Sequence, residues 1–138
     1  MISYALSALL SGNNADKILL YLWSRRTPVM DALLFAKAAR EEKDAMLETY
    51  LASADSVAGE QIAKLKAAGA SDELLREVFD SVLTDCFYNI LLGIDGQMPI
   101  GSLGERSYRL LAPDSTVISN ASGELAEAAY EAFYGEEG

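Results

Sequence analysis

The longest regular pattern of apolar positions runs from residue 71 to residue 94. Apolar side chains recur there at alternating spacings of three and one, which is typical of a wide apolar stripe along an α-helix. Ser71 is placed to cap this helix, and Asp72 and Glu73 follow in its first turn. We predict that it is the buried central element of the fold. Its apolar positions are Leu75, Val78, Phe79, Val82, Leu83, Cys86, Phe87, Ile90, Leu91 and Ile94.

A second long helix is predicted upstream of the central one. Thr27 followed by Pro28 is a typical helix start, and the helical pattern then continues to about Ala52. The middle of this helix, residues 37–45 ("KAAREEKDA"), is charged, so we expect it to face solvent. The apolar residues close to one face are Phe35, Ala39, Met46 and Tyr50.

Shorter helices are predicted on either side of the long one. Asp55 or Ser56 caps a helix that stops at Gly69 and carries only a narrow apolar stripe, so it should lie on the surface. The first 26 residues are expected to hold two short helices separated by a turn. The run "KILLYLW" (residues 17–23) fits a strand equally well, because a short apolar run does not distinguish the two by periodicity.

The pattern changes after the central helix. Four glycines follow within a dozen positions, and residues 106–112 ("RSYRLLA") and 116–119 ("TVIS") then flank Pro113-Asp114-Ser115, which predicts a β-hairpin. Ser122 or Gly123 starts a last helix, with Leu125, Ala129 and Phe133 facing inward. We therefore predict a mainly α (α+β) fold. It is a single domain spanning 1–138, a bundle of about five to six helices with one small C-terminal β-hairpin.

Composition and charge restrict the function. The chain of 138 residues has 51% hydrophobic and 23% charged residues, as expected of a globular protein. Its net charge of −10 argues against nucleic acid as a direct partner and favours a basic protein partner. No segment reaches the roughly 20 apolar residues of a membrane span. With a single cysteine and no basic leader before the first apolar stretch, we expect a cytoplasmic protein without membrane association.

Few residues are suited to catalysis or to metal binding. The chain contains no histidine and only one cysteine, so a typical zinc site is not expected. Cys86 lies in the apolar stripe next to Asp85, and we expect it to be buried and inert rather than nucleophilic. Paired acids such as Glu41 and Glu42 have no spacing tied to a mechanism. We therefore expect no enzyme activity, no catalytic residues and no metal.

The glycine-rich stretch, residues 93–104, fits no phosphate or calcium motif. Gly104 precedes Glu105-Arg106 where a P-loop needs Lys and Ser or Thr, and the positions of calcium ligands are also wrong. The glycines and Pro99 instead suit a helix end followed by entry into the hairpin. We expect no cofactor, and a small-ligand site at this loop is the less favoured interpretation.

One family resemblance follows from these residues. A helix ending in "FYNILLGIDG", a glycine-containing loop, a strand such as "RSYRLLA" and a short acidic last helix resemble small acidic uncharacterised bacterial proteins of the toxin-immunity or accessory type. The resemblance covers residues 79–134 and rests on mainly apolar motifs. It implies a non-enzymatic, protein-binding role and carries no individual functional residue.

The combined prediction is a protein-binding module, immunity-like or regulatory, that occludes a basic partner. The acidic last helix and the loop from Asp95 to Glu105 would cover a cationic surface. An alternative is a small-molecule-binding or enzymatic domain with a pocket between the central helix and the hairpin. A third is a homo-oligomer that buries Tyr4, Trp23 and Tyr134 at a subunit contact. The predicted partner-binding residues are Asp95, Glu105, Glu124, Glu127, Glu131 and Tyr134.

Overall fold

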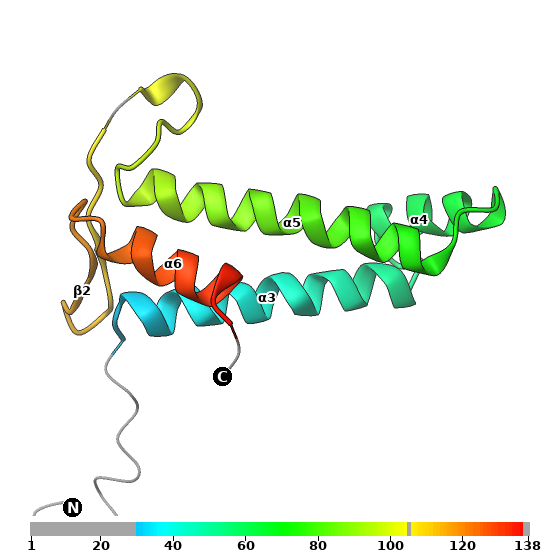
Figure 1. The fold of residues 1–138 in the computed structure, drawn as a ribbon, viewed down its shortest axis with the longest axis horizontal. Coiled ribbons are helices and arrows are strands. Elements are labelled where there is room, and N and C mark those ends of the chain that lie inside the picture. The colour runs from blue at the N-terminus through cyan, green and yellow to red at the C-terminus, as the bar shows by residue number, and fades with distance from the viewer. Residues whose placement is uncertain (1–29, 105, 137–138) are drawn as a thin grey trace, which may run out of the picture.

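The computed structural model describes residues 30–104 and 106–136. In this part of the chain, four α-helices and one two-stranded antiparallel sheet follow one another (Figure 1). The predicted mainly helical fold with a small hairpin is confirmed, whereas the predicted helix count of five to six is not. The two short helices expected before residue 27 lie outside the described residues. The elements are α3 (Ala32–Ala52), α4 (Val57–Ala67), α5 (Asp72–Ile94), a 3-10 turn η1 (Gly101–Leu103), β1 (Leu110–Leu111), β2 (Val117–Ser119) and α6 (Glu124–Tyr134).

Three of the four helices in the described residues begin at polar caps, one of which differs from the prediction. Helix α3 starts at Ala32, where the Asp31 carboxylate accepts a 2.8 Å hydrogen bond from the backbone N–H of Leu34. The start predicted at Thr27-Pro28 is therefore wrong by one turn, because Asp31 is the stronger cap. Ser56 caps α4 and Ser71 caps α5 as predicted, each by accepting a backbone N–H three residues on.

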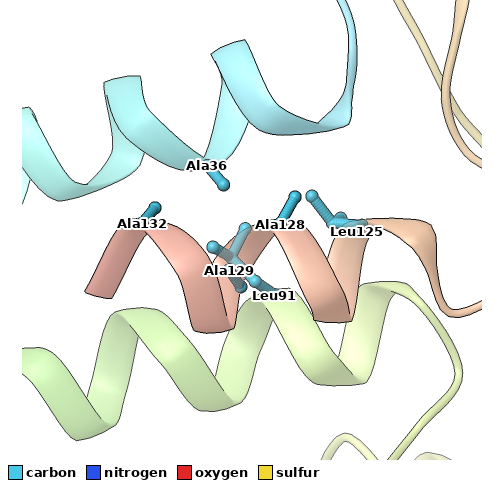
Figure 2. Close-up of a cluster of buried hydrophobic side chains, with 6 residues drawn as sticks. All are labelled: Ala36, Leu91, Leu125, Ala128, Ala129 and Ala132. Carbon is cyan, nitrogen blue, oxygen red and sulfur yellow. The ribbon is translucent and has the colours of Figure 1, made fainter. Parts of the chain in front are cut away.

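Helices α3 and α5 run antiparallel along the length of the molecule, and α6 packs against both of them near one end (Figure 1). Helix α4 packs against α3 near the other end. Small side chains fill the seam between α3 and α6, which allows the two helices to pack closely. The buried cluster at this seam comprises Ala36, Leu91, Leu125, Ala128, Ala129 and Ala132 (Figure 2).

Most of the middle of α3 faces solvent as predicted, but Lys43 is an exception because it is buried. Its ammonium group lies 2.5 Å from a carboxylate oxygen of Asp80 on α5 and 2.6 Å from one of Asp44. Burial lowers the pKa of Lys43, but the two carboxylates outweigh it and raise the pKa overall. Lys43 thus links α3 to α5 as a cation. Its spacing of seven from Ala36 and four from Leu47, which are both buried, is the sequence signal for this position.

The prediction that α5 is the least exposed element is also wrong. Leu75 and Leu91 are buried, but Val78, Val82 and Ile90 are 50%, 51% and 45% exposed. Cys86, predicted to be buried, is exposed as well. The apolar stripe of α5 is wider than the surface that α3 and α6 cover, so part of it has no packing partner among the described residues.

The glycine-rich stretch ends α5 as predicted. Gly96 adopts a left-handed conformation (φ 71°), its N–H donates to the carbonyl of Gly93, and Gln97 N–H donates to that of Leu92. This is the hydrogen-bond pattern of a Schellman motif, which satisfies the last carbonyls of a helix. Strands β1 and β2 then pair with Leu110 opposite Ser119. The hairpin is shorter than predicted, and its end lies against α3 and α6. None of the helices in the described residues is both long and apolar enough for a bilayer crossing.

Candidate partner-binding surface on α6

Helix α6 presents its acidic side chains outward, as predicted. Glu124, Glu127 and Glu131 are exposed, whereas Leu125 and Ala129 are buried against the core. These spacings of three and four residues separate the two faces of an amphipathic helix. Phe133, predicted on the inner face, is only half-buried. The exposed carboxylates therefore stand on a helix whose other side is firmly packed.

Asp95 holds the first turn of α6 and is not a contact residue for a partner. Its side chain is completely buried, with one carboxylate oxygen 2.7 Å from the Ser119 hydroxyl that donates to it. The other oxygen accepts the backbone N–H of Ala126 at 3.0 Å. The structure thus places Asp95, one of the predicted partner-binding residues, in the interior and not on the surface. Glu105, predicted with it, lies outside the described residues.

The role of Asp95 follows from the residue that precedes α6. Gly123 occupies the N-cap position in a left-handed conformation (φ 91°) and has no side chain to accept a helix N–H. The carboxylate of Asp95, at the end of α5, supplies that acceptor instead. A negative charge at a helix N-terminus is also favourable because of the helix dipole. The geometry of the α6 surface is thus fixed by a buried carboxylate from α5.

Beside the acidic side chains, α6 exposes two tyrosines. Tyr130 is 60% exposed and Tyr134 is 48% exposed, with their ring centroids 5.7 Å apart. Tyr134 also meets Tyr88 of α5 edge to face, at a centroid distance of 5.1 Å. Contacts between aromatic rings in these geometries are more stabilising than the buried area of the rings alone would give. Sequence reasoning identified Tyr134 but missed Tyr130 and Tyr88, although the spacing of four between Tyr130 and Tyr134 places them on one face.

The surroundings of Tyr134 favour the protonated form of its phenol. Partial burial raises its pKa above the usual value for tyrosine, and the negative charge of Asp85 and the proximity of Tyr88 raise it further. The hydroxyl of Tyr134 is therefore a hydrogen-bond donor at neutral pH. It stands next to a carboxylate of α5, so this edge of the surface combines an aromatic face, a donor and a negative charge.

On its other edge, the acidic face of α6 meets cations of α3. A groove of about 630 Å³ lies between the two helices, and Glu131 lines it together with Lys37 and Arg40. The Arg40 guanidinium donates a 2.8 Å hydrogen bond to the carbonyl of Ala132. The groove is also lined by Glu41, Asp44 and Glu136, so acidic side chains outnumber its two cations. Glu124 and Glu127 are exposed and form no ion pair with another described residue. With the two tyrosines, they make up the more available part of the surface.

The described residues contain no group of three or more His, Cys, Asp or Glu side chains arranged to hold a metal ion. The exposed side of α6 offers carboxylates, phenols and aromatic faces on a fixed helix. We call the surface formed by Glu124, Glu127, Tyr130 and Tyr134 the α6 surface. Comparisons of the chain with protein-family models, curated proteins and solved structures found no match.

Proposed function

We propose that the protein is a non-enzymatic protein-binding module whose α6 surface binds a basic partner. The observation that carries this proposal is the pair of exposed, mutually packed tyrosines beside exposed carboxylates. Tyrosine is enriched at protein interfaces because it supplies a large contact area with few rotamers. Two exposed aromatic rings side by side on one helix face form an apolar patch, and such patches often mark sites of protein interaction.

The chemistry of the α6 surface fits arginine or lysine side chains on the partner. A guanidinium group stacks on an aromatic face and at the same time forms a charge-assisted hydrogen bond with a nearby carboxylate. The net charge of −10 would attract such a partner at long range and raise the association rate. The exposed carboxylates would thus mainly affect association, whereas Tyr130 and Tyr134 would mainly affect dissociation.

The concrete form of the proposal is inhibition by occlusion, as in an immunity-like or regulatory protein. A rigid helix that covers a cationic surface of another protein denies that surface to its own ligand or substrate. Helix α6 suits this role because Asp95 fixes its first turn and the buried alanine seam fixes its length. No conformational change of this helix is needed for binding, which limits the entropy lost on association.

The test starts with affinity capture of the partner and then measures binding kinetics with the purified pair. Tyr130→Ala/Tyr134→Ala should raise the dissociation rate at least tenfold. Glu124→Gln/Glu127→Gln/Glu131→Gln should slow association and weaken its salt dependence. The control is Glu42→Gln/Glu60→Gln/Glu73→Gln, which removes the same charge from exposed positions on α3, α4 and α5. If the two triple variants changed the association rate equally, the carboxylates of α6 would contribute only through the net charge of the protein.

A small-molecule site near the hairpin remains the second candidate, and one observation favours it. The hydroxyl of Tyr108, which precedes β1, is buried without a hydrogen-bond partner among the described residues. Buried polar groups usually have a partner, so a ligand hydroxyl or carbonyl could fill this position. Calorimetric titration with ATP, Mg²⁺ and Ca²⁺ should give no saturable heat if the protein-binding proposal is right. A micromolar site that Tyr108→Phe weakens would favour the second candidate.

A homo-oligomer is the third candidate, with Tyr134 at the subunit contact. Sedimentation of the purified chain across a range of concentrations distinguishes it from the first two. A concentration-dependent dimer that Tyr134→Ala dissociates would assign the α6 surface to self-association.

A further inference from the structure

Helix α5 carries two parallel rows of apolar side chains, and only one of them is packed. The packed row begins at Leu75 and ends at Leu91, with a spacing of four. The second row consists of the residues one position earlier, and we call it the exposed row. Its four large members are 45–54% exposed, and its total length is about 24 Å at 1.5 Å per residue. The exposed row is Leu74, Val78, Val82, Cys86 and Ile90.

Acidic and polar side chains border the exposed row. Glu73, Glu77 and Asp85 precede its members by one position each and are exposed. The cation on this helix, Arg76, is engaged with Glu48 of α3. A segment that covers the exposed row must therefore be apolar in the middle and should carry positive charges at its edges.

The chain enters α3 close to this row. Helix α3 begins at the end of the bundle where α5 finishes (Figure 1), and Ala32 and Leu33 pack against the cluster that contains Leu91. Five residues, 27–31, separate residue 26 from the start of α3, and five residues span at most about 17 Å. Whatever precedes residue 27 is therefore tethered within reach of Ile90.

The segment before this link has the required composition. Residues 16–26 read "DKILLYLWSRR", with six consecutive apolar residues between Lys17 and Arg25-Arg26. Residues 1–29 hold three basic residues and one acidic residue, a net charge of +2, whereas the other residues hold 8 basic and 20 acidic residues, a net charge of −12. Eleven residues extend about 16 Å as a helix or about 36 Å as a strand. Either length exceeds the roughly 12 Å from Ile90 to Val82.

We propose that residues 16–26 of this chain cover the exposed row of α5. The apolar run packs on Val82, Cys86 and Ile90, and the flanking cations lie beside the acidic border. Charge disfavours a second copy as the occupant, because two identical acidic borders would meet across the contact. This inference concerns α5 and is independent of the function proposed for the α6 surface.

The single cysteine of the chain lies in the exposed row, which makes the proposal directly measurable. Leu19→Cys, Leu20→Cys and Leu22→Cys each place a second thiol in the segment. Mild oxidation of the dilute full-length protein should give an intrachain disulfide with Cys86 in at least one of the three, identified by peptide mapping. Ala63→Cys on the exposed side of α4 is the control and should give none. Disulfide-linked dimers alone would assign the row to a second copy and overturn the proposal.

The labelling rate of Cys86 gives an independent readout. In the full-length protein, a thiol reagent should label Cys86 at least tenfold more slowly than in Leu19→Asp/Leu22→Asp, which puts charges into the apolar run. Ser24→Asp adds a charge to the same segment without removing an apolar side chain and should retain the protection. Circular dichroism verifies that each variant keeps its helix content. Labelling at the rate of an unprotected thiol in every variant, with no disulfide in any cysteine pair, would overturn the proposal.

Discussion

Asp95 and Ser119 form a buried hydrogen bond of 2.7 Å between the end of α5 and strand β2, 24 residues apart in sequence. Through the same carboxylate, Asp95 also accepts the N–H of Ala126 in the first turn of α6. Three elements therefore meet at one acidic side chain. A charge buried at this depth persists only when its oxygens are bonded, so the two contacts depend on one another.

Removal of this junction should be costly. Ser119→Ala leaves one oxygen of a buried carboxylate without its donor, and we expect a loss of about 1–3 kcal/mol in the free energy of unfolding. Asp95→Ala removes both hydrogen bonds and the cap of α6, so its loss should be larger than that of Ser119→Ala. Urea denaturation measures both. Ser102→Ala, an exposed serine in η1, is the control and should stay within about 0.5 kcal/mol of the wild type.

The alanine seam between α3 and α6 should not tolerate larger side chains. Ala132 is buried on the side of α6 that faces α3 (Figure 2), so Ala132→Leu should force the two helices apart and cost about 1–3 kcal/mol. Ala45→Leu makes the same change on the exposed face of α3 and should be close to neutral. Thermal melts compare the two variants. Equal melting temperatures would mean that the seam is loosely packed.

Lys43 should make stability fall at high pH. Its pKa is raised in the folded protein, because the carboxylates of Asp44 and Asp80 outweigh the effect of burial. The pKa of Lys43 is therefore higher in the folded than in the unfolded chain, where it is about 10.5. The stabilisation that Lys43 contributes is complete below the unfolded-state pKa and is lost as the pH rises through the folded-state pKa. Chemical denaturation between pH 8 and pH 11.5 should show this loss in the wild type. Lys43→Met should show a shallower loss over the same range, since other groups that titrate there are unchanged.

Tyr134 should titrate above the usual range for tyrosine. Burial is the main reason that its pKa is raised, and Asp85 contributes through its charge. Carbon-13 NMR of the tyrosine Cζ resonances resolves the seven tyrosines of the chain individually. Asp85→Asn should lower the pKa of Tyr134 without restoring the usual value, because burial remains. A Tyr134 pKa that is unchanged in this variant would show that the two side chains are farther apart in solution.

The sequence predicts the elements of this fold better than their burial. Local signals suffice for α4, α5 and α6, because the caps Ser56 and Ser71 and the 3.6-residue period lie within each helix. The exposure of Val82 depends on which helix lies alongside α5, and no local pattern contains that information. The spacing of Lys43 from Ala36 and Leu47 is a local signal for its burial, but its partner Asp80 lies 37 residues away on α5. The same holds for the α6 surface. The spacing of Glu124, Glu127 and Glu131 is enough to predict that they face outward. The burial of Asp95 depends instead on contacts with Ser119 and Ala126, which are 24 and 31 residues away in sequence.

The buried seam between α3 and α6 also determines when the protein is able to fold during its synthesis. Ala36 is made about ninety residues before its partners Leu125 and Ala129, which takes roughly 5–20 s at the usual rate of translation. During that interval, α3 and α5 exist without the helix that covers their shared apolar face. Loop closure over such a distance in the chain is slow, so the nascent chain is a natural client for chaperones that bind apolar segments. A ribosome stalled before residue 124 would therefore carry a chain with an incomplete core and an exposed apolar surface.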